Sequence, residues 1–217
     1  MRIFRYSLII CFFLFSRDAF PQETGAAEEA LRSLNRIESK MTEIKSLKAD
    51  FIQEKDLVIF KKKVTLSGRI YMQKSNRLAW HVDKPVRYSV LITDKVIRQW
   101  DEDTDRVQEI AISENPIMRT VFEQLTVWFN GRYTALLKDY DVKLVQKNPV
   151  VFEFSPKASN AAIKVIRSIT IGLKDDERYL KWIKILEING DSTTIKFNNT
   201  ILNPLLDDRD FEVKGRV

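Results

Sequence analysis

Apolar and polar side chains alternate along most of this chain, and this alternation restricts the possible folds more than any other feature. It begins at Leu47, where apolar side chains start to recur at every second residue, and it returns over residues 64–73 and 78–83. Successive side chains of an extended strand point to opposite faces, so a period of two indicates strands with one apolar and one polar face. Antiparallel sheets have this character, because one of their faces commonly remains in water.

Similar segments continue toward the end of the chain and bring the predicted total to about eleven strands. Short polar turns join them, without the helix between successive strands that a parallel sheet requires. We therefore predict a mainly β protein of the α+β class, built on one antiparallel sheet. The other predicted strands cover residues 87–93, 96–101, 106–112, 141–146, 150–155, 166–173, 179–189 and 192–202.

Two segments carry a helical period instead. The first places one apolar stripe along a helix, formed by Leu31, Leu34, Ile37, Met41 and Ile44. The second begins at Asn115-Pro116, an N-cap residue followed by a proline suited to the first turn, and ends at Gly131. A short helical piece is expected over 132–138. The second segment has apolar residues at helical spacing: Met118, Val121, Phe122, Leu125, Trp128 and Phe129.

These helices are available to cover the apolar face of the sheet. An exposed apolar face of this size would be an aggregation surface, so it needs a cover. Two interpretations remain open. The helices complete an ordinary core, or the second helix forms a lid over a ligand cavity.

The residue content excludes most catalytic and metal chemistry. The 217-residue chain has one histidine and one cysteine, whereas a zinc site or a disulfide needs more such residues. The cysteine, Cys11, lies in the apolar stretch at the N-terminus, so a Cys–His nucleophile pair is not expected either. The histidine, His81, lies beside Trp80 on a predicted strand and is expected to be a bystander. The sequence contains no nucleophile elbow, phosphate-binding loop or zinc-protease motif. We predict no enzyme, no catalytic or metal site, and no cofactor.

Two charged segments are interpreted as exposed hairpin turns. Residues 101–105 begin like a calcium loop, but Arg106 stands where that loop needs glycine and Ile112 where it needs glutamate. Lysines 61–63 join two strand-like segments. The formal net charge of +6 is spread along the chain without a basic stripe, so nucleic acid is not an expected partner.

The N-terminus has the pattern of an export signal. Arg2 and Arg5 accompany an apolar stretch from Ser7 to Phe15 that is too short to span a membrane. We predict a signal peptide over residues 1–20, cleaved between Ala19 and Ala26, followed by a single domain over 21–217.

An ordered set of short motifs covers almost the whole remaining chain. They are Phe51-x-Gln53, Gly68-x-Ile70-Tyr71, Leu78-x-Trp80 followed by Pro85, and residues 154–160, 194–198 and 210–213. In this order they resemble the periplasmic outer-membrane lipoprotein carrier family, LolA. The last two motifs resemble the closing strands of that family.

The resemblance implies a strongly curved, incomplete antiparallel β-barrel whose concave apolar face is covered by helices. It also implies a periplasmic, monomeric carrier that shields the acyl chains of a lipoprotein and shuttles it from the inner to the outer membrane. The implied partners are the acylated lipoprotein, an inner-membrane release complex and an outer-membrane acceptor.

The resemblance assigns roles to residues of two strands and of the second helix. Lys74 takes the position of a family arginine that hydrogen-bonds to the lid, so it is the expected lid latch, with a point charge in place of a planar fork. Thr93-Asp94-Lys95 also departs from the Asp-Gly that the family tends to have there. The acyl-chain cavity is expected to be lined by Leu78, Trp80, Val90, Ile92, Met118, Val121, Phe122, Leu125 and Trp128.

Other functions remain open on the sequence. A carrier or sensor of another envelope lipid, such as a glycolipid, would use the same cavity with different polar groups at its rim. A structural envelope protein would have a filled core and no exchangeable ligand.

Overall fold

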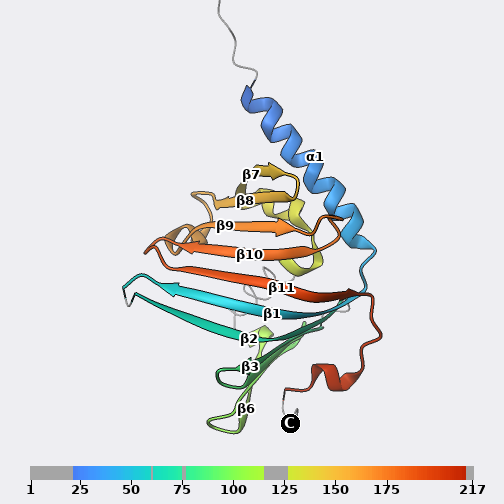
Figure 1. Ribbon diagram of the computed structural model, residues 1–217, viewed down its shortest axis with the longest axis vertical. Helices are drawn as coiled ribbons and strands as arrows, with labels where there is room; N and C mark the ends of the chain where they lie inside the picture. The colour runs from blue at the N-terminus through green and yellow to red at the C-terminus, as the bar shows by residue number, and fades with distance from the viewer. Residues whose placement is uncertain (1–21, 60, 75–76, 115–126, 214–217) are drawn as a thin grey trace, which may run out of the picture.

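The computed structural model describes residues 22–59, 61–74, 77–114 and 127–213, and the predicted signal peptide therefore lies outside the described residues. Within these residues, eleven strands form one sheet (Figure 1). The strands are β1 (Ser46–Leu57), β2 (Lys62–Gln73), β3 (Arg77–Lys84), β4 (Tyr88–Ile92), β5 (Val96–Asp101), β6 (Arg106–Ala111), β7 (Tyr140–Lys147), β8 (Val150–Pro156), β9 (Ile166–Leu173), β10 (Leu180–Glu187) and β11 (Ser192–Leu202).

The sheet is antiparallel throughout and is not closed. Its strand order is β6-β5-β4-β3-β2-β1-β11-β10-β9-β8-β7, so that β6 and β7 are the two outer strands. Neighbours in the sheet are also neighbours in the sequence, except that β1 pairs with β11 and so joins the first half of the chain to the second. The prediction of an incomplete antiparallel barrel is confirmed.

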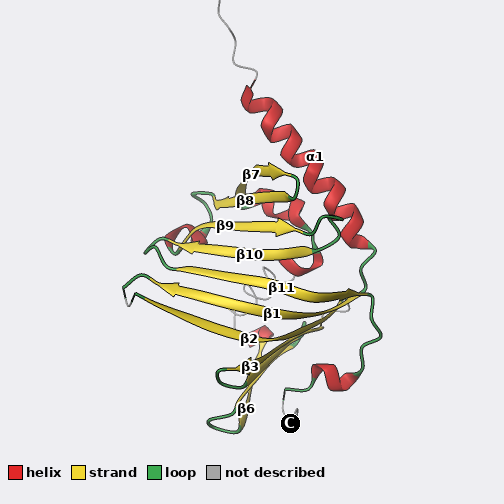
Figure 2. Ribbon diagram, viewed as in Figure 1, coloured by secondary structure: helices red, strands yellow, loops and turns green. Residues whose placement is uncertain are grey.

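One long helix, α1 (Gln22–Thr42), packs beside the β7 end of the sheet (Figure 2). Leu34, Ile37 and Met41 are fully buried against the core, as their spacing predicts. Leu31 was wrongly assigned to this stripe: it is 41% exposed, and Ala30 is buried instead. The start of α1 projects past β7 (Figure 1), whereas Glu29 already reaches that strand through its ion pair with Lys147 at 2.6 Å.

Most of the second predicted helix lies outside the described residues. Its last turn, residues 127–130, is helical and ends at Gly131, which has a positive φ of 71°. A β-carbon at Gly131 would lie 2.4 Å from the Met41 sulfur, so the chain turns tightly beneath the end of α1. The short helical piece predicted over 132–138 is present as a 3₁₀ helix, η2 (Tyr133–Lys138).

The C-terminal segment covers part of the sheet face that lies opposite Leu78 and Trp80, and its structure differs from the predicted one. Residues 210–213 are not a closing strand, because Asp207 and Asp210 form a capping box that starts a 3₁₀ turn, η4 (Asp208–Phe211). Phe211 is 2% exposed and packs with three residues of β2–β4, namely Tyr71, Ala79 and Leu91.

His81 connects this C-terminal segment to the sheet. Its Nε2 lies 3.1 Å from the Asp210 carbonyl oxygen, and its Nδ1 lies 2.9 Å from the Ser89 hydroxyl. A carbonyl oxygen can only accept, so Nε2–H donates to Asp210. His81 is 3% exposed and lies on the sheet face opposite Leu78 and Trp80. Its two contacts give it a structural role, because they link the C-terminal segment to the sheet.

Both predicted hairpin turns are present. Asp101 and Arg106 close the β5–β6 hairpin, and the Asp101 carboxylate accepts hydrogen bonds from the Thr104 backbone N–H and hydroxyl at 2.9 Å. Lys61 has a φ of 48° in the turn between β1 and β2. Within the part of the chain that the structure describes, every helix is too short or too polar to cross a bilayer.

Candidate functional site

An apolar cavity of about 320 Å³ lies on the inner face of the sheet. Its described walls come from β3, β4, β9, β10 and β11, together with the turn at residues 128–129, and they carry no charged side chain. The lining residues are Leu78, Trp80, Tyr88, Val90, Ile92, Trp128, Phe129, Ile169, Ile183, Ile185 and Ile195.

Strand register explains why these side chains face one space. Trp80 pairs with Val90, and Ile183 pairs with Ile195, so each pair shares one face of the sheet. In the strand order, β1 and β2 separate the β3–β4 wall from the β9–β11 wall. Both walls reach the same cavity because the sheet is curved around it. Phe51 of β1 packs against Trp80 of the β3–β4 wall, with ring centroids 4.0 Å apart and the rings tilted by 34°.

Trp128 and Phe129 close one side of the cavity. The Trp128 ring meets Phe154 of β8 edge-on with centroids 4.9 Å apart, and Phe129 meets Phe197 of β11 at 6.4 Å. Such edge-to-face geometry is favourable for aromatic pairs and holds both rings in place. On the opposite wall, burial raises the pKa of the Tyr88 hydroxyl further above its ordinary value of 10.0, so this polar group of the lining stays uncharged.

The structure brings five of the nine predicted cavity residues to this space. They are Leu78, Trp80, Val90, Ile92 and Trp128. The other four, Met118, Val121, Phe122 and Leu125, lie outside the described residues. Whether any of these side chains contacts an acyl chain stays a prediction.

Sequence reasoning missed the wall formed by the later strands. Ile195 lies between two polar residues, and Ile183 and Ile185 lie two residues apart around Lys184, so their place on one face of a strand was readable. Their place in the cavity depends on the curvature of the sheet, for which the sequence carries no local signal. Tyr88, Phe129 and Ile169 also line the cavity and were not assigned to it.

Lys74 holds the end of α1 in this structure. Its ammonium group donates a hydrogen bond to the Met41 carbonyl oxygen, at the C-terminal end of the helix where a cation is favoured. Burial lowers the pKa of Lys74. Its role as a lid latch stays a prediction, because most of the predicted lid lies outside the described residues.

An ion-pair cluster ties α1 to the loop between β9 and β10. The Glu177 carboxylate accepts hydrogen bonds from two Arg36 nitrogens at 2.9 Å and from Lys40 at 2.8 Å. The hydrogen bonds from Arg36, followed by that from Lys40, lower the pKa of Glu177 below its ordinary value of 4.5.

Glu177→Gln is expected to remove a pH-dependent part of the stability. The ion pairs stabilise the fold fully above the unfolded-state pKa, and this stabilisation is lost as the pH falls through the lower folded-state pKa. The variant should be less stable than the wild type by up to about 1 kcal/mol near neutral pH and should converge with it once the pH falls below the folded-state pKa of Glu177. Urea titrations across this range measure the difference, with Asp103→Asn in the exposed β5–β6 turn as a control. If the difference in the free energy of unfolding persists in acid, the ion pairs of Glu177 are not its cause.

The fold and cavity together define a class of protein: an open antiparallel half-barrel with an apolar internal site. A family model described as "Outer membrane lipoprotein carrier protein LolA" matches residues 42–214. The chain belongs to this family, which is one of carriers and not of enzymes. A comparison with curated protein sequences returns no match.

Solved structures show the same fold at low sequence identity. An uncharacterised conserved protein from Thermus thermophilus is 11% identical, with a TM-score of 0.54, over 86% of this chain and 94% of that one. A chain of the Pseudomonas aeruginosa MucA/MucB complex is 14% identical, with a TM-score of 0.52, over 86% of this chain. The present chain spans 61% of that second protein's length. At these identities the likeness concerns the fold alone.

Proposed function

We propose that this protein is a periplasmic carrier that shields the acyl chains of a lipoprotein in the cavity and shuttles it from the inner to the outer membrane. The observation that carries the proposal is the uncharged cavity between the curved sheet and the turn at Trp128 and Phe129. The proposed partners are an inner-membrane release complex and an outer-membrane acceptor, as in the family. The proposed working form is a monomer consisting of residues 21–217, without catalytic activity.

The size of the cavity fits a carrier that must also release its cargo. A volume of about 320 Å³ is at the lower end of the range for small-molecule pockets, about 300–1,000 Å³. Each buried CH₂ group contributes roughly 0.8 kcal/mol, so enclosing every acyl chain of a lipoprotein would hold the cargo too tightly. We infer that the acyl chains are only partly enclosed, and that loading displaces the turn at residues 128–129.

Filling the cavity tests this proposal. Ile195→Trp places a large side chain in the cavity and is expected to reduce uptake of an acylated lipopeptide by about tenfold or more, because the apolar space is lost. Ile201→Trp on the same strand is the matched control, since Ile201 is 53% exposed. Native mass spectrometry of the folded variants with added diacylated and triacylated lipopeptides measures the uptake.

Two results would contradict the proposal. If wild-type protein takes up no lipopeptide and envelope-purified protein carries no lipid, the cavity is part of an ordinary core. If Ile195→Trp and Ile201→Trp bind the lipopeptide equally well, the acyl chains bind elsewhere. Extraction of lipid from envelope-purified protein identifies the cargo, since its head group separates a lipoprotein from a glycolipid.

A further inference from the structure

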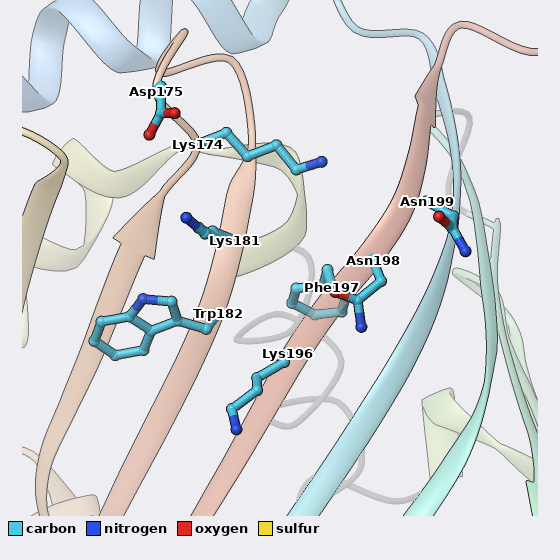
Figure 3. Close-up of a pocket in the computed structure, with 8 residues that line it drawn as sticks. All are labelled: Lys174, Asp175, Lys181, Trp182, Lys196, Phe197, Asn198 and Asn199. Carbon is cyan, nitrogen blue, oxygen red and sulfur yellow. The ribbon is translucent and has the colours of Figure 1, made fainter.

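A second hollow lies on the outer face of the sheet, opposite the cavity. Trp182 and Lys196 are cross-strand partners on this outer face, whereas the adjacent pair Ile183 and Ile195 faces the cavity. The hollow has a volume of about 520 Å³ and is called the outer groove below (Figure 3). Its lining residues are Lys174, Asp175, Lys181, Trp182, Lys196, Phe197, Asn198 and Asn199.

The outer groove forms where two neighbouring strands separate. Pairing between β10 and β11 ends at Trp182 and Lys196, after which β11 continues along β1 as far as Leu202. The β10 strand has a register shift between Leu180 and Trp182 and continues along β9. The diverging ribbons are visible in Figure 3. The groove is therefore a consequence of the backbone path as well as of surface side chains.

Phe197 separates the groove from the inside of the protein. It is 3% exposed and meets Tyr179 and Phe129 with ring centroids 6.4 Å away in each case. Phe129 also lines the cavity. The outer groove therefore has an aromatic floor, and a ligand could occupy it without entering the cavity.

The Trp182 indole forms a fixed wall of the groove. Gly172 is its cross-strand partner on β9, and a β-carbon there would lie 2.2 Å from the indole nitrogen. Glycine thus lets the indole lie flat across β9. The wall exists before any ligand arrives, which lowers the entropic cost of binding.

The charge of the groove favours an anion. Three lysines line it against a single acidic residue, Asp175. The Lys196 ammonium nitrogen lies 3.5 Å from a Glu54 carboxylate oxygen, whereas Lys174 and Lys181 form no ion pair among the described residues. Asn199 is already engaged, since its amide donates to Asp50 at 2.7 Å. Two lysine ammonium groups and the Asn198 amide therefore remain as donors for a ligand.

We propose that the outer groove binds a phosphate-bearing polar group, with Lys174 and Lys181 supplying its charge contacts. Lysine binds phosphate as a point charge, and charge-assisted hydrogen bonds are stronger than neutral ones. The volume exceeds what a bare ion needs and suits a glycerophosphate-sized group beside the Trp182 indole. The proposal does not depend on cargo binding in the cavity, because the sheet separates the two sites.

Calorimetric titration of the full-length protein with sn-glycerol 3-phosphate is the first test. We expect saturable binding of one molecule per chain, weakened about tenfold or more in the double variant Lys174→Glu/Lys181→Glu. Lys184→Glu is the matched control, because Lys184 is an exposed residue of the same strand that does not line the groove. The control should bind within about twofold of the wild type.

Flotation with vesicles distinguishes the two sources of such a group. Binding to phosphatidylglycerol vesicles that is lost in the double variant and kept in Lys184→Glu assigns the groove to a membrane headgroup. Binding of glycerol phosphate without vesicle binding assigns it to a free phosphate ester. The proposal is overturned if neither probe binds saturably at millimolar concentration, or if Lys184→Glu weakens binding as much as the double variant.

Discussion

Replacing Gly68 by alanine is expected to lower the free energy of unfolding by about 3 kcal/mol. A β-carbon at this position would lie 1.8 Å from the His81 carbonyl oxygen and 2.9 Å from the Val82 α-carbon. Both contacts are to backbone, which cannot rotate away as a side chain can. The register of β2 against β3 shifts at Gly68, so the two strands approach closely there.

Urea unfolding followed by far-ultraviolet circular dichroism measures this loss. Gly25→Ala is the control, because Gly25 is within α1 and the added carbon would have no atom within 4 Å apart from its chain neighbours and the backbone of its own helix. Alanine there should leave stability unchanged or raise it by up to about 1 kcal/mol. If Gly68→Ala is as stable as the wild type, β2 and β3 are not held at the spacing described.

Phe154→Ala is expected to destabilise the protein by about 3–5 kcal/mol. Phe154 is fully buried and contacts Trp128, Tyr133, Tyr140 and Phe152 in the aromatic cluster beneath the cavity. Its removal leaves a void that these large rings cannot fill. Because Trp128 rests edge-on against Phe154, the same change should also loosen one wall of the cavity.

Thermal unfolding and lipopeptide uptake separate these two effects. Phe154→Leu keeps much of the volume and should lose less than about 1.5 kcal/mol. If uptake falls in Phe154→Ala under conditions where the variant is still folded, Trp128 contributes to the cavity as described. A loss of stability no larger than that of Phe154→Leu would show that the cluster repacks.

The strands were the most predictable part of this protein. Residue-by-residue alternation around Phe51, Trp80 and Ile195 places their side chains on one face of each strand, and that pattern survives in the fold. The turn at residues 101–105 was also predictable, since Arg106 is incompatible with a calcium loop. Each of these features depends on neighbours in the sequence, and local sterics decide them.

The sequence-based predictions that were wrong have a different physical origin. Leu31 has the correct helical spacing, yet Ala30 faces the core in its place, and the next residue of a helix points about 100° away, so the Leu31 side chain stays exposed. Residues 210–213 were expected as a strand, but the Asp207–Asp210 capping box starts a turn and Phe211 fills a space on the outer face. In both cases the tertiary surroundings override a local pattern.

The sequence by itself determined the antiparallel strands, the apolar stripe of α1, the membership of the carrier family and part of one cavity wall. Only the tertiary structure decided that Ile183 and Ile195 face the same space as Trp80, and that Trp182 and Lys196 border a separate groove on the other face. Alternation assigns side chains to the faces of a strand and leaves open how strongly the sheet curves and where strands separate. Those features depend on packing between distant segments, such as Phe197 against Phe129 and Trp182 over Gly172.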